Sequence, residues 1–237
     1  MSQEIVKDGI LCIPLYHGTA TLFSDSIKQH GLGAVNPIKD HSVLSFMKEV
    51  FELCDRCFTN EPDWEASKFA PTWIIDQKNF FASANFQHGE TYLTPSRSSA
   101  VGYALTNRFG SECLTQTYRL FMLLKERKPL VLAENKLDEH PLVKLFSYRS
   151  EPVLVTVESV PLTYLASENG GPVELVINNL IEMLAVFRAR ESVGPRDILR
   201  SSGITLNYNF RLIKPLPPGT LTLEVLSVAD EQNPYAW

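Results

Sequence analysis

The sequence has no run of apolar residues long enough to cross a membrane. Its first residues include Glu4, Lys7 and Asp8, which are charged where a secretory signal would be apolar. We therefore expect a cytoplasmic protein without membrane contacts, and delivery into a host cell would need a route that uses no signal peptide. Internal repeats, low-complexity tracts and linker-like stretches are also absent, so we expect one domain over residues 1–237.

An excess of basic residues is also missing. The chain carries 22 lysines and arginines against 27 aspartates and glutamates, and its net charge is −5. Because a domain that binds nucleic acid through bulk charge is normally basic, we expect no bulk nucleic-acid binding. The hydrophobic fraction of 44% is ordinary for a globular protein that forms a core of its own.

Cysteine is scarce, with four residues in the chain. Cys54 and Cys57 have the spacing of a zinc-binding pair, but neither a second such pair nor a nearby pair of histidines accompanies them. A three-residue step inside a helical pattern also places both side chains on one face of the helix. We expect no metal site, and we expect the two thiols to be buried or half-buried.

Apolar periodicity predicts strands and helices in a mixed order, which favours an α+β fold. The predicted strands cover residues 10–15, 91–94, 117–124, 129–132, 153–160, 207–213 and 221–228. The predicted helices cover residues 23–32, 43–58, 96–103 and 176–190. Ser96 or Ser98 is expected to cap the third of these helices, and Gly31 and Gly33 to close the first.

Two motifs mark a candidate site. The first is an aromatic-His-Gly-Thr tetrad after a short strand, followed by a helix with an isoleucine and a Gly-Leu end. Its residues are Tyr16, His17, Gly18, Thr19, Ile27, Gly31 and Leu32. The second motif consists of Tyr92 and Tyr103, which ten residues separate, with a stretch rich in serine and alanine before the second tyrosine. The two motifs are far more specific together than either is alone.

In this order the two motifs resemble those of diphtheria-type ADP-ribosyltransferases and poly(ADP-ribose) polymerases. The resemblance implies an ADP-ribosyltransferase fold, a split β-sandwich of two antiparallel sheets flanked by helices, with NAD bound as co-substrate in a central cleft. Relative to a minimal domain of this family, residues 37–88 would be a helical insertion. We expect the insertion to cover the cleft or to form the acceptor surface, with Phe80, Phe81 and Phe86 near the nicotinamide.

The resemblance also implies roles for individual residues. His17 would donate a hydrogen bond to the adenosine-side ribose, and the backbone of Gly18 would bind the carboxamide, where a missing Cβ lets the ligand approach closely. Thr19 would support the ribose or the loop. Tyr92 and Tyr103 would sandwich the nicotinamide, because aromatic faces attract a cationic ring.

Enzymes of this family usually also carry a late glutamate that stabilises the oxocarbenium-like state and holds the nicotinamide ribose. Two positions compete for this role. Glu174 lies in a segment similar to that of diphtheria toxin, although an acid is also favoured at the start of the helix that follows. Asn209 stands where many bacterial members have the acid, and an amide supplies no negative charge. Both alternatives stay open at this point.

The resemblance implies a mono-ADP-ribosyltransferase that modifies a macromolecular acceptor, either a protein or a nucleic acid. A bacterial toxin, effector or defence factor would fit, and a cognate inhibitor would then be a further partner. Two alternatives remain. An NAD glycohydrolase would use water as the acceptor in the same cleft, and a degenerate domain would keep the fold as a binding module.

Overall fold

A computed structural model describes residues 5–77, 88–188 and 208–227. Runs of helices and runs of antiparallel strands follow one another along the described chain, which confirms the α+β prediction. The chain divides into two compact units. We call residues 1–35, 90–108 and 151–237 the sheet unit, and residues 36–89 and 109–150 the helical unit. The expected insertion at 37–88 falls within the helical unit, which also contains residues 109–150.

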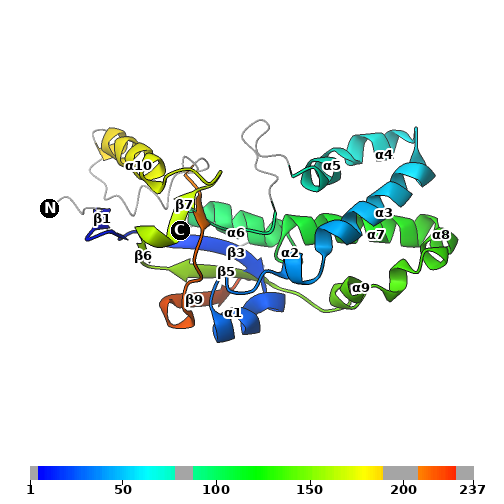
Figure 1. Cartoon of the computed structure of the whole chain (residues 1–237), viewed down its shortest axis with the longest axis horizontal. Coiled ribbons are helices and arrows are strands. Elements are labelled where there is room, and N and C mark those ends of the chain that lie inside the picture. Colours follow the sequence, from blue (N-terminus) through cyan, green and yellow to red (C-terminus); the bar gives the residue numbers. More distant parts are fainter. Residues whose placement is uncertain (1–4, 78–87, 189–207, 228–237) are drawn as a thin grey trace. The chain divides into compact units, whose positions relative to one another are not determined.

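The described strands of the sheet unit form three antiparallel sheets of three strands each, shown in Figure 1. The first sheet has the order β3 (Leu15–Ala20), β5 (Pro152–Val157) and β9 (Leu221–Val225). The second has the order β4 (Thr91–Leu93), β8 (Phe210–Leu212) and β7 (Leu165–Ser167). The third has the order β1 (Val6–Lys7), β2 (Ile10–Leu11) and β6 (Val160–Pro161). An isolated antiparallel bridge between Tyr16 and Thr94 joins the first two sheets.

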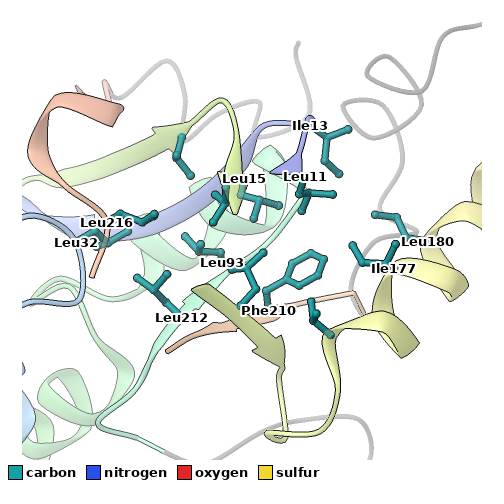
Figure 2. Close-up of a cluster of buried hydrophobic side chains, with 14 of the residues drawn as sticks. Leu11, Ile13, Leu15, Leu32, Leu93, Ile177, Leu180, Phe210, Leu212 and Leu216 are labelled. Atoms are coloured by element: carbon teal, nitrogen blue, oxygen red, sulfur yellow. The ribbon is translucent and has the colours of Figure 1, made fainter. Parts of the chain in front are cut away.

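Three α-helices accompany the described strands of the sheet unit: α1 (Ser24–His30), α6 (Arg97–Thr106) and α10 (Val173–Arg188). Short 3₁₀ turns are η1 (Thr21–Phe23), η3 (Leu162–Tyr164) and η5 (Pro218–Thr220). The main core joins all three sheets and α10, and Figure 2 shows Leu15, Leu93, Phe210 and Leu180 within it. Removing such apolar surface from water is the main driving force for folding this unit.

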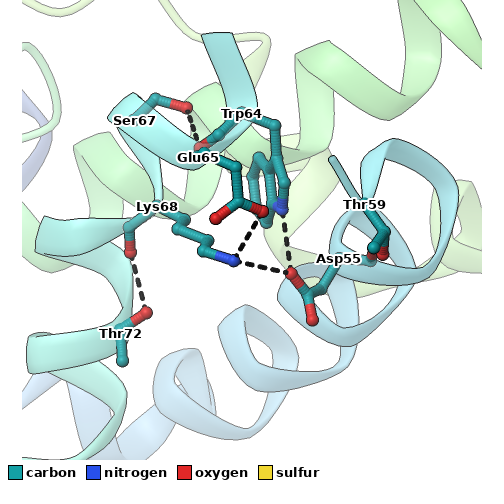
Figure 3. Close-up of polar contacts among 7 residues, drawn as sticks. All are labelled: Asp55, Thr59, Trp64, Glu65, Ser67, Lys68 and Thr72. Atoms are coloured by element: carbon teal, nitrogen blue, oxygen red, sulfur yellow. Dashed lines mark hydrogen bonds and ion pairs between the residues drawn. The ribbon is translucent and has the colours of Figure 1, made fainter. Parts of the chain in front are cut away.

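The helical unit is built from α3 (Val43–Phe58) and α7 (Glu112–Arg127), which pack against each other. The remaining elements are α2 (Pro37–Asp40), α4 (Pro62–Ser67), α5 (Phe69–Ile75), α8 (Pro129–Glu134), η2 (Leu137–Glu139) and α9 (Pro141–Phe146). Figure 3 shows a polar cluster on α3, α4 and α5, in which the indole of Trp64 donates a hydrogen bond to Asp55 and Lys68 pairs with Asp55 and Glu65.

Two predicted strands are wrong. Residues 117–124 lie inside α7, because Ser111 caps a helix in which buried side chains recur every three or four residues. They are Cys113, Leu114, Thr115, Thr117, Leu120, Phe121 and Leu124. Residues 129–132 belong to α8, which begins at a proline, where the missing N–H removes no helical hydrogen bond.

Most other predicted elements are confirmed with shifted ends. The helix at 43–58 matches α3, and Gly31 ends α1 with a φ of 91°. The strand predicted at 10–15 is two strands, β2 and β3, so His17 lies inside β3 rather than after a strand. None of the helices in the described ranges is long and apolar enough to span a bilayer.

Candidate functional site

His17 is half-buried in β3, and its imidazole reaches the neighbouring strand β4. The Nδ1 atom lies 2.8 Å from the backbone oxygen of Tyr92, so Nδ1–H is the donor in this contact. Burial lowers the pKa of His17, and the bond to Tyr92 opposes that shift without cancelling it. A neutral ring that donates through Nδ1 accepts at Nε2. From the sequence we expected His17 to donate a hydrogen bond to a ribose hydroxyl. In this tautomer the hydroxyl would instead donate to Nε2.

The side chain of Tyr92 points away from the main core. Its neighbour Leu93 is buried in that core, and successive side chains of a strand point to opposite faces. The bridge between Tyr16 and Thr94 relates β3 to β4, because opposite residues of an antiparallel pair point to the same side. By alternation Tyr92 shares the side of Thr94, and Gly18 shares the side of Tyr16. Tyr92 and Gly18 therefore lie on the same side of the joined sheets.

Helix α6, which carries Tyr103, covers this same side of β3. A Cβ on Gly18 would lie 2.2 Å from the backbone oxygen of Ala100 and 2.9 Å from the backbone nitrogen of Ala104. The space that we expected a ligand to use is thus taken by the helix. The glycine lets α6 approach the sheet closely enough to bring Tyr103, one residue before Ala104, next to the strand that carries His17.

Local contacts hold α6 in this position. Ser96 caps its N-terminus by accepting a hydrogen bond from Ser99 N at 3.2 Å, which selects Ser96 over Ser98 as the cap. Arg97 forms an ion pair with Glu224 on β9, with 3.0 Å between Nη2 and Oε2. Tyr103 itself remains accessible to solvent, since this residue is 38% exposed.

Thr19 lies within the protein. It is 2% exposed and pairs with Val153 on β5. Of the two roles expected for Thr19, its burial favours support of the surrounding chain over contact with a ribose.

The two candidates for the acid differ in their surroundings. Glu174 is exposed in the first turn of α10, where the helix dipole and unpaired N–H groups favour an acid. Asn209 is half-buried immediately before β8, and its Nδ2 donates to Oε2 of Glu168 at 3.1 Å. Sequence reasoning missed Glu168. The available signal was its place directly after a short apolar strand, at the start of a turn with two glycines.

The helical unit bears on two further expectations. Cys54 is buried and Cys57 is half-buried, as predicted, and burial raises the pKa of Cys54 to about 12. Within the described ranges, no group of three or more histidines, cysteines and acids could hold a metal ion. Phe80, Phe81 and Phe86 lie outside the described residues.

Comparisons with known proteins assign no family to this arrangement. Neither a scan against protein-family models nor searches of the curated proteins and of the solved structures gave a match. The motif residues and the contacts between them are therefore the basis for a functional proposal.

Proposed function

We propose that this protein is a mono-ADP-ribosyltransferase that transfers ADP-ribose from NAD to a macromolecular acceptor. One observation carries the proposal. The imidazole of His17 is bonded to the backbone of Tyr92, and the helix that carries Tyr103 packs against Gly18, the residue after His17. These contacts join β3, which carries His17, to β4, which carries Tyr92, and to α6, which carries Tyr103, within the sheet unit. An ADP-ribosyltransferase fold of the sheet unit belongs to the same proposal.

The reaction breaks the bond between the nicotinamide nitrogen and C1′ of its ribose. The bonding electron pair leaves with nicotinamide, which becomes neutral, and C1′ gains positive charge. A nucleophilic atom of the acceptor then bonds to C1′ and releases its proton to solvent. Tyr92 and Tyr103 would hold the nicotinamide ring between them, since both lie on one side of the joined sheets and an aromatic face attracts a cationic ring.

His17 would hold the other ribose through Nε2. Its lowered pKa keeps the ring neutral near pH 7, and Tyr92 O fixes the tautomer. A positioned acceptor at this point orients the dinucleotide and adds no second positive charge to that of the cationic nicotinamide ring.

The test uses NAD labelled on the adenylate side, incubated with a cell lysate and either wild-type or His17→Ala protein. The wild type should label a protein or nucleic acid, and His17→Ala should lose most of this labelling. His30→Ala is the matched control, because His30 is exposed in the last turn of α1. An absence of any labelled macromolecule with the wild type would contradict transfer.

A second measurement separates transfer from the alternatives. Nicotinamide release should depend on the added macromolecule, whereas release of equal size in buffer alone would indicate an NAD glycohydrolase. Binding of NAD in calorimetry without any release would indicate a binding module. Tyr103→Ala should weaken NAD binding, and Tyr148→Ala, which removes another exposed tyrosine, should leave it unchanged.

A further inference from the structure

Arg211 is a half-buried cation that pairs with none of the described acids. It lies at the centre of β8, and its buried Nε atom has no hydrogen-bond partner among the described residues. The ion pairs within the described ranges are made by other bases, namely Lys68, Arg97 and Arg127. Because a guanidinium group keeps its charge and a charge removed from water needs a partner, Arg211 is suited to an anion from outside the described chain.

A glycine turn holds the guanidinium group in place. Gly170 has a φ of +84°, and a Cβ there would lie 2.8 Å from Nη2 of Arg211 and 3.2 Å from its Cζ. The guanidinium group therefore occupies the space that a side chain at position 170 would fill. The turn is closed by Gly170 N, which donates to the oxygen of Ser167 at 2.9 Å, and by Ser167 N, which donates to Gly171 O at 3.0 Å. A cation held in this way loses little conformational freedom when an anion binds.

The strand register places Arg211 beside Tyr92. Arg211 lies opposite Tyr92 on β4 and opposite Ala166 on β7. Opposite residues of an antiparallel pair lie on one face of the sheet, with Cβ atoms about 5 Å apart. The residues before and after Arg211 are Phe210 and Leu212, which are buried in the main core (Figure 2), so the row of Arg211 is on the other face.

Strand β4 lies between Arg211 and His17. The backbone oxygen of Tyr92 contacts His17 of β3, and β4 pairs with β8 along its other edge. In the proposed site His17 holds the adenosine-side ribose and Tyr92 the nicotinamide, and the phosphates of NAD link the two riboses. Arg211 is therefore beyond the nicotinamide end, away from the phosphates. A cation there repels the cationic nicotinamide ring unless an anion pairs with it.

We propose that Arg211 is the docking point for an acidic side chain of a protein acceptor. The proposal rests on NAD-dependent transfer as the proposed function and names the class of acceptor. A planar guanidinium group binds a carboxylate through two parallel N–H···O bonds, and the bound carboxylate neutralises the charge beside the nicotinamide. Arg211 selects the acceptor and takes no part in breaking the bond between nicotinamide and ribose.

A protein acceptor fits this position better than a nucleic acid. The other members of the row, Tyr92 and Ala166, are uncharged, and the net charge of the chain is −5. Binding along a nucleic-acid backbone uses several cations that neutralise successive phosphates. A single cation between uncharged neighbours matches one carboxylate.

The experiment uses the full chain, NAD labelled on the adenylate side and a cell lysate. Arg211→Met should lower the labelling of lysate proteins by about 10-fold, since it removes a charged hydrogen-bond donor, and should leave the Kd for NAD unchanged. Arg56→Met is the matched control, because it removes an exposed arginine of α3. Poly-L-glutamate should inhibit labelling by the wild type at about 10-fold lower concentration than labelling by Arg211→Met.

A second variant keeps the test decisive if Arg211→Met does not fold. Arg211→Lys retains the charge without the paired N–H groups, so it should label less than the wild type at an unchanged Kd for NAD. Labelling by the folded variants equal to that of the wild type, a label that nuclease removes, or a raised Kd for NAD would each overturn the docking role. A wild type that binds NAD but labels no macromolecule would overturn the proposed function, and the docking role with it.

Discussion

The polar contacts at the candidate site and those of the cluster in Figure 3 join residues over different lengths of chain. In the sheet unit, the contacts of His17 with Tyr92 and of Asn209 with Glu168 join residues 75 and 41 positions apart. In the polar cluster of the helical unit, Lys68 contacts Glu65 three positions away and Asp55 13 positions away, and Trp64 contacts Asp55 nine positions away (Figure 3). The first set exists only when the strands have paired, whereas the second lies within neighbouring helices.

We expect the long-range contacts of the candidate site to matter for ligand binding more than the contacts of the exposed polar cluster do. Polar groups brought together from distant strands need a folded sheet to support them, and half-buried groups of this kind interact more strongly with a ligand than exposed ones. Exposed ion pairs between neighbouring turns contribute little to folding. We therefore expect substitutions around α6 and β3 to change NAD binding, and substitutions in the polar cluster of α3 to α5 to leave it unchanged.

The largest effect is expected from Gly18→Ala. The new Cβ would lie 2.2 Å from the backbone oxygen of Ala100, so α6 must move away from β3 at a cost of about 3 kcal/mol of unfolding free energy, and NAD binding should weaken. Gly102→Ala is the matched control in α6, since nothing lies within 4 Å of its Cβ, and it should stabilise the protein by about 0.5–1 kcal/mol. Equal urea midpoints for the two variants would contradict the packing role of Gly18.

Two helices of the helical unit show which elements could be predicted from the sequence. The helix at 43–58 was predictable because its buried residues follow one helical face without interruption. The segment at 117–124 was not, because Thr117 and neighbouring polar positions of α7 imitate the alternation of a strand while Thr117 itself is fully buried. The spacing of apolar residues predicts secondary structure only where the buried residues are apolar. A buried polar residue such as Thr117 is therefore counted as exposed, and the predicted spacing is wrong.

Some residues of the candidate site could be predicted from the sequence and others could not. His17, Tyr92 and Tyr103 stand in short motifs, so their residue types and spacing were visible in the sequence. Glu168 has no motif, and its contact with Asn209 depends on the pairing of β7 with β8. The reason for Gly18 was also misread, because a glycine looks the same in sequence whether a ligand or a helix approaches it.

A smaller effect is expected from pH, and it tests burial in the helical unit. Burial lowers the pKa of His88 to about 4, below the value of 6.5 that the unfolded chain would have. The unfolded state therefore binds more protons below about pH 6.5, and the contribution of His88 to stability is lost as pH falls toward 4. Between about pH 7.5 and pH 5 the loss is about 2 kcal/mol.

Urea unfolding of the wild type and His88→Gln at both pH values measures this contribution. The variant should show the weaker pH dependence, while His41→Gln, which changes an exposed histidine of the same unit, should follow the wild type. Parallel pH dependence for wild type and His88→Gln would contradict the burial of His88 as its cause.

Helix caps provide a matched pair across the two units. Ser96 caps α6 by accepting from Ser99 N at 3.2 Å, and Ser111 caps α7 by accepting from Leu114 N at 3.1 Å. Replacing either serine with alanine should lower the unfolding free energy by about 1 kcal/mol, since each leaves a helical N–H without its acceptor. Only Ser96→Ala should raise the KM for NAD, because α6 carries Tyr103. An equal rise in KM for Ser111→Ala would show that the two units do not differ in this respect.

The smallest effects are expected from the ion pairs. Arg97 is 12% exposed where it pairs with Glu224, whereas Lys68 is 31% exposed where it pairs with Asp55 and Glu65. Arg97→Met should cost about 1 kcal/mol of unfolding free energy and raise the KM for NAD, because it loosens α6 from β9. Lys68→Met should leave both the urea midpoint and the KM unchanged, because water and salt screen an exposed pair. High salt should lower the urea midpoint of the wild type no further than the substitution Arg97→Met does. If Lys68→Met lost as much stability as Arg97→Met, the exposed ion pair of Lys68 and the less exposed ion pair of Arg97 would not differ in their contribution to folding.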